Sequence, residues 1–75
     1  MQPYLNLSGD SGVRAYELGP DFIDVQFQDR EKPYRYRSER VGRENVEQMK
    51  KLAVAGRGLS TFINQHPEVK KGYDR

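Results

Sequence analysis

One stretch, Phe22 to Gln28, limits the fold of this chain more than any other feature. Apolar Ile23, Val25 and Phe27 alternate there with polar residues. Because successive side chains of a strand point to opposite faces of a sheet, this period of two predicts a strand with one buried face. We therefore expect these three apolar side chains to begin the core and to be covered by elements that come later in the chain.

Two further stretches favour strands on either side of this one. Val13 to Leu18 precedes it, and the turn residues Gly19 to Asp21 separate the two. Tyr34 to Ser38 follows after the charged turn Asp29 to Pro33, and its residues again alternate in character. Strands joined by such short links pair with their neighbours, so the sequence predicts a three-stranded antiparallel meander.

The hydrophobic periodicity changes after the third strand. Apolar residues then recur at spacings of three and four: Val46, Met49, Leu52 and Ala53. This pattern predicts an amphipathic helix that begins between Gly42 and Asn45 and ends at Gly56. A second, shorter helix is expected over Leu59 to Gln65, because Pro67 prevents its continuation. The predicted fold is α+β, a three-stranded antiparallel β-meander packed against two short C-terminal helices.

Length and composition favour one small domain. A chain of 75 residues that is 35% hydrophobic buries too little surface to be divided further, and it has little room for a deep ligand pocket. We expect residues 1–12 to form a flexible N-terminal arm and residues 13–75 a single domain. No cysteine or long apolar run is present, so we expect a soluble cytoplasmic protein without a membrane partner. We expect a monomer, or a weak homodimer in which a free sheet edge pairs two copies.

The usual catalytic groups are scarce. The chain has a single histidine, His66, and no thiol, and we interpret His66 as a partly buried residue at the end of the second helix. Gly56 to Gly58 is interpreted as a turn between helices, since no strand precedes it as a phosphate-binding loop requires. We therefore expect no enzymatic activity, no metal, no cofactor and no small-molecule substrate.

The distribution of charge is uneven along the chain. Residues 1–31 carry a net charge of −4, and residues 32–75 carry +6. Tyr34 and Tyr36 share one strand face and are expected to be core or half-buried, with their hydroxyl groups at the rim. The bases that we expect to hold the phosphates of a nucleic acid are Arg35, Arg37, Arg57, Lys70 and Lys71.

Three short motifs resemble the KTSC family, small domains found alone in bacterial proteins and at the C-terminus of some lysyl-tRNA synthetases. They are Tyr34-Arg35-Tyr36, the segment from Gly58 to Asn64, and the basic segment from Val69 to Tyr73. The residues that match are Tyr34, Tyr36, Gly58, Phe62, Asn64 and Tyr73. The chain departs from the pattern at Gln65 to Glu68, a link that is longer than usual.

Two classes of function follow. The family has no established activity, and its association with a tRNA synthetase implies RNA binding, so our first hypothesis is a non-catalytic domain that binds RNA or another nucleic acid through its basic residues. The alternative is a protein–protein interaction module. The acidic first half favours the alternative, because Asp24 and its neighbours would repel a polyanion.

Overall fold

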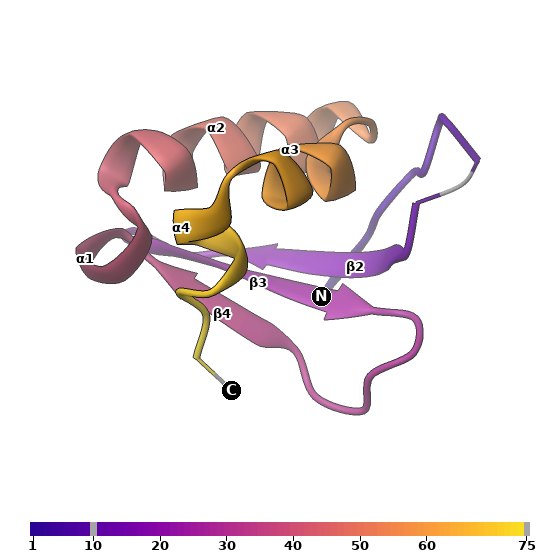
Figure 1. Ribbon diagram of the computed structural model, residues 1–75. Helices are drawn as coiled ribbons and strands as arrows, with labels where there is room; N and C mark the ends of the chain where they lie inside the picture. The colour runs from indigo at the N-terminus through magenta and orange to yellow at the C-terminus, as the bar shows by residue number, and fades with distance from the viewer. Residues whose placement is uncertain (10, 75) are drawn as a thin grey trace.

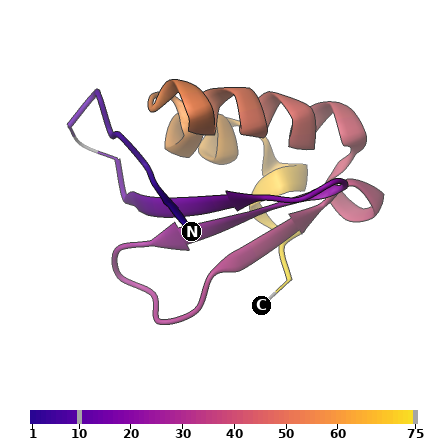
Figure 2. The ribbon, with the colours of Figure 1, turned by 180° about the vertical axis from the view of Figure 1, so that it is seen from behind.

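An antiparallel sheet forms one layer of the molecule, and the helices lie across one of its faces (Figures 1 and 2). This is a computed structural model that describes residues 1–9 and 11–74. The strands follow chain order across the sheet: β1 (Gln2–Pro3), β2 (Val13–Leu18), β3 (Phe22–Phe27) and β4 (Tyr34–Arg37). The helices are α1 (Ser38–Val41), α2 (Arg43–Ala55), α3 (Leu59–Gln65) and α4 (Pro67–Lys70). The predicted α+β class is confirmed.

The central strand β3 carries the middle of the core, as its alternation predicts. Ile23 and Val25 are fully buried, and Phe27 at the end of the strand is half-buried and packs against the same cluster. Ile23 lies opposite Tyr36 of β4, and Val25 lies opposite Tyr34. Both tyrosines therefore face the helices, which confirms that they belong to the core.

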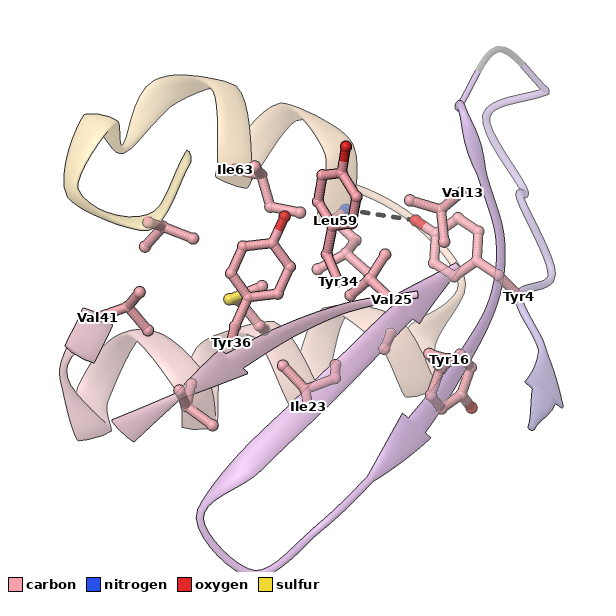
Figure 3. Packing of buried hydrophobic residues seen from close by; sticks show 14 residues of the cluster. Tyr4, Val13, Tyr16, Ile23, Val25, Tyr34, Tyr36, Val41, Leu59 and Ile63 are labelled. Atoms are coloured by element: carbon pink, nitrogen blue, oxygen red, sulfur yellow. Dashed lines mark hydrogen bonds between the residues drawn. The ribbon is translucent and has the colours of Figure 1, made fainter. Parts of the chain in front are cut away.

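The prediction of three strands is wrong, because the segment before β2 adds a fourth. Within the predicted N-terminal arm, residues 1–12, β1 pairs antiparallel with β2. The next residue, Tyr4, is buried, and its hydroxyl accepts a hydrogen bond from the Leu59 backbone N–H at 3.3 Å (Figure 3). A two-residue strand has no room for a periodic pattern, so the sequence carries no signal for it. Asp10 of the arm lies outside the described residues.

Helices α2 and α3 have the expected bounds and the expected buried faces. Val46, Met49 and Ala53 of α2 contact the core, and Gly56 ends the helix with a φ of 79°. This left-handed conformation is one that glycine adopts without the penalty a Cβ would bring. The long apolar stripe of α2 therefore lies against the inner face of the sheet.

Two short helices, α1 and α4, were not predicted. The prediction of two short C-terminal helices is therefore wrong, because the structure has four helices in its described part and they are not all C-terminal. α1 follows β4 without a loop, and its Val41 is buried. Pro67 ends α3, as expected, but it also opens α4, because a proline at the first helical position loses no hydrogen bond. The link from Gln65 to Glu68 thus contains the junction between the two helices.

His66 lies between α3 and α4 and is partly buried, which confirms its interpretation. Its ring stacks on Phe62 with 4.0 Å between centroids, and its Nδ1 lies 2.7 Å from the Phe62 carbonyl oxygen. Val69 of α4 is fully buried. The histidine therefore holds the junction that turns α4 back toward the sheet.

The residues after α4 return to the edge of β4. The backbone N–H of Arg35 donates to the Asp74 carbonyl at 2.6 Å, and the Asp74 N–H donates to the Arg35 carbonyl at 2.7 Å. Tyr73 stacks on Tyr34, with ring centroids 4.1 Å apart and planes 10° apart. The tail thereby covers part of an edge that would otherwise present unpaired backbone groups. Arg75 lies outside the described residues.

Candidate functional site

An open pocket of about 770 Å³ lies where the end of the β3–β4 hairpin meets α3, α4 and the tail. Its apolar side is formed by Ile63 and by four aromatic residues, namely Phe27, Tyr34, Tyr36 and Tyr73. Its polar side consists of Asp29, Arg30, Ser60, Asn64, Lys70 and Lys71. A chain of this size has little room for a deep pocket, and this one is open rather than enclosed.

The aromatic side of the pocket is held together by ring contacts. Tyr34 is stacked on Tyr73 and meets Phe27 edge to face, with 5.3 Å between centroids. Tyr36 meets Tyr73 at 6.2 Å and 61°. The three tyrosines come from β4 and from the tail, segments that are nearly forty positions apart in the sequence. The tail therefore builds one wall of the pocket.

Tyr36 is the most deeply buried member of this wall, with 1% of its surface exposed. It lines the pocket, and its hydroxyl makes no hydrogen bond with any residue in the described part of the chain. Burial raises the pKa of the Tyr36 phenol, and the nearby phenols of Tyr34 and Tyr73 raise it further. The hydroxyl group thus stays protonated and can donate a hydrogen bond to a molecule in the pocket.

Three bases surround the opening of the pocket. Arg30 comes from the turn between β3 and β4, and its Nε donates to the Tyr34 hydroxyl at 2.9 Å. Lys70 and Lys71 stand at the end of α4; both are exposed, and neither forms an ion pair within residues 1–9 and 11–74. Asp29 is the single carboxylate of the lining. The pocket therefore combines aromatic surface with a net positive charge.

Arg35 lies on the opposite face of the sheet from the helices. Its guanidinium donates two hydrogen bonds to the Asp24 carboxylate, at 2.8 and 3.0 Å, and lies 3.9 Å from the centroid of the Phe22 ring. The hydrogen bond to Asp24 is the main cause that raises the pKa of Arg35. The register pairs Asp24 directly with Arg35, so the salt bridge follows from the hairpin itself.

Arg37 is also engaged by carboxylates. It contacts Glu39 and Asp74, each at 3.2 Å, and Asp74 contacts Arg40 at 3.0 Å as well. Arg57 is exposed in the turn between α2 and α3 and does not line the pocket. Of the five bases expected to hold phosphates, only Lys70 and Lys71 line the pocket, and Arg35, Arg37 and Arg57 do not.

Most of the residues on which the resemblance to the KTSC family depends lie around one pocket, whereas the five expected bases do not. Tyr34, Tyr36, Asn64 and Tyr73 all line the pocket. Gly58 precedes α3 with a φ of 81°, and Phe62 contributes to the packing under that helix. Residues that the sequence did not single out are Phe27, Asp29, Arg30 and Ser60. Nothing in the charged turn after β3 distinguishes Arg30 from a solvated base, so no sequence signal would have found it.

Comparison of the chain with protein-family models, with curated proteins and with solved structures finds no match. The resemblance to the KTSC family therefore stays a prediction. Within the described part of the chain, no helix is both long and apolar enough to span a bilayer. The same residues contain no cluster of three or more histidine or carboxylate side chains arranged to hold a metal ion.

Proposed function

We propose that this domain is a non-catalytic binding module for single-stranded nucleic acid, with RNA as the first candidate. Its site is the pocket lined by Tyr34, Tyr36 and Tyr73, here called the tyrosine pocket. The observation that supports this is the convergence of Arg30, Lys70 and Lys71 with four aromatic rings around one opening. Proteins that hold single strands combine cations for the phosphates with aromatic surfaces for the bases. Phe27 and Tyr73 both line the pocket and are half-buried.

The number of bases that line the pocket sets the expected salt dependence. If Arg30, Lys70 and Lys71 each neutralise one phosphate charge, the slope of log K against log salt is about −2 for a single strand. Fluorescence anisotropy with labelled single-stranded RNA and DNA of about ten nucleotides measures this slope. Absence of binding at low salt, or binding that does not weaken as salt is added, would refute the proposal.

A pair of charge-matched variants tests the location of the site. Lys70→Gln/Lys71→Gln removes two charges from the pocket, whereas Lys51→Gln/Arg43→Gln removes two exposed charges from α2. We expect the pocket variant to bind about tenfold or more weakly, and the α2 variant to lose only the small part due to net charge. Equal losses in the two variants would show that binding depends on overall charge and not on the pocket.

A protein-interaction module is the second candidate, and a different surface supports it. Met1, Leu18 and Val54 are each about half exposed and line a second hollow beside β2 and α2. Exposed apolar side chains that cluster in this way are common at protein interfaces. Affinity capture from the source cell separates the candidates: one stoichiometric protein partner that survives nuclease treatment, lost with Leu18→Lys but kept with the pocket variant, would favour this second function.

A further inference from the structure

Several of the described bases of this protein are engaged by carboxylates, and others line a single pocket. Arg35, Arg37 and Arg40 face carboxylates outside the pocket, whereas Arg30, Lys70 and Lys71 line its opening. A strand of several nucleotides needs successive phosphate contacts along a groove. We propose, on the basis of the function proposed above, that the tyrosine pocket binds one nucleoside monophosphate unit, either free or at the end of an RNA strand.

The size and lining of the pocket suit such a ligand. Its volume of about 770 Å³ falls within the range of roughly 300 to 1,000 Å³ that is typical of small-molecule sites. Phe27 and Tyr73 offer ring surface to a flat base, and the exposed amide of Asn64 supplies both a donor and an acceptor for the base edge. An amide beside aromatic rings favours a nucleobase over an aliphatic anion.

The charged groups divide the pocket into a place for the phosphate and a place for the sugar. Lys70 and Lys71 are consecutive at the end of α4, and Arg30 comes from the hairpin turn on the other side. A phosphate between them would be contacted from both elements. Asp29 repels the phosphate but can accept hydrogen bonds from ribose hydroxyl groups, so it favours the orientation with the sugar on its side.

Tyr36 supplies an observation that is independent of charge. No buried side-chain nitrogen or oxygen of the described residues lacks a hydrogen-bond partner, so a hydroxyl that bonds to no described residue keeps some contact with solvent. Here the hydroxyl belongs to a side chain that is 1% exposed and that lines the pocket. A ligand oxygen or ring nitrogen in the pocket would accept its hydrogen bond.

Two-dimensional amide NMR on the ¹⁵N-labelled full chain tests the proposal. The probes are AMP and UMP, the matching nucleosides, inorganic phosphate and phosphotyrosine, and hexauridylate with and without a terminal phosphate. We expect the amides of Lys70, Lys71 and the hairpin turn to shift with the monophosphates, and nucleosides and inorganic phosphate to bind at least about tenfold more weakly. Tyr36→Phe should weaken UMP binding about fivefold, while Lys51→Gln/Arg43→Gln should leave it unchanged.

The outcomes separate this proposal from the function on which it rests. Suppose that hexauridylate binds at the pocket, that AMP and UMP do not bind, and that a terminal phosphate does not change hexauridylate binding. The nucleic-acid function then stands, and the single-nucleotide site is overturned. Tighter binding of phosphotyrosine than of any nucleotide overturns both and assigns the pocket to a phosphorylated peptide. A preference for phosphorylated over unphosphorylated hexauridylate supports a strand end, whereas binding of free monophosphates alone supports a free nucleotide.

Discussion

The hydroxyl group of Tyr4 is expected to stabilise the fold through helix α3. The Leu59 N–H is the first of the helix, where backbone donors have no partner within the helix. Gly58 before it has no side chain to cap the helix, and Leu59 is fully buried. The Tyr4 hydroxyl accepts this hydrogen bond at 3.3 Å. The substitution Tyr4→Phe removes the acceptor and keeps the ring.

The expected size of the effect follows from the state of the Leu59 donor after substitution. An N–H left buried without an acceptor, or a lost helix cap, costs about 1 kcal/mol. For a domain of this length, that lowers the melting temperature by about 4 to 8 °C. The larger change Tyr4→Ala also leaves a cavity and costs about 3 to 5 kcal/mol, comparable with the roughly 3 to 5 kcal/mol that a small unstapled core supplies. Tyr4→Ala is therefore expected to be largely unfolded.

Thermal and urea unfolding followed by circular dichroism measure both variants. Tyr16→Phe is the matched control: Tyr16 is about as buried as Tyr4, but its hydroxyl makes no hydrogen bond with a described residue. If Tyr4→Phe unfolds at the same temperature as Tyr16→Phe, the hydroxyl contributes nothing and the reasoning is refuted. If Tyr4→Ala stays fully folded, the first residues are an arm that the core does not need.

Three further predictions concern the tail, the core and the outer face. Gly72→Ala would place a Cβ 2.7 Å from a backbone oxygen of α4 and should cost about 1 to 3 kcal/mol of stability. In the control Gly12→Ala the added Cβ meets no atom, so thermal unfolding should be unchanged. Equal stability of the two variants would contradict this prediction. Because burial raises the pKa of Tyr36 above the ordinary value of about 10, the folded state keeps a proton that the unfolded state loses, so stability falls as the pH rises above about 10. Tyr36→Phe should flatten the fall in urea midpoint between about pH 9 and 11, and an unchanged fall would refute it. In a double-mutant cycle of Asp24→Asn and Arg35→Gln, the losses in stability should be less than additive, and strict additivity would show that the pair does not interact.

Periodic elements of the fold were predictable from the sequence, and elements without a period were not. β2, β3, β4, α2 and α3 appear within one or two residues of their expected bounds. β1, α1 and α4 are two to four residues long, too short for any hydrophobic period to show. These short elements are formed because tertiary contacts of Tyr4, Val41 and Val69 hold them against the core.

The site was predicted in part, and the part that failed did so for a physical reason. As the alternation in β4 predicts, Tyr34 and Tyr36 face the helices, and Arg35 and Arg37 lie on the other face. The same register then brings Arg35 against Asp24, so a base that looks free in the sequence is neutralised across the hairpin. Whether a base is available to a ligand therefore depends on which residue lies opposite it across the strands. A count of charges along the sequence does not show this.

The tail, in contrast, brings together residues that are far apart in the sequence. The pocket combines residues of several motifs, and no single motif contains it. Pro67 ends one helix and starts another, and the turn at His66 directs α4 toward the hairpin. Lys70 and Lys71 then stand over the tyrosines of β4, and Tyr73 completes the ring cluster. The link from Gln65 to Glu68 is thus the segment that assembles the pocket. Replacing Pro67 by alanine should permit α3 to run on, displace Tyr73 from Tyr34, and remove ligand-induced shifts at Lys70 while the β3–β4 pairing persists in NMR spectra; unchanged shifts would show that the pocket forms without this turn.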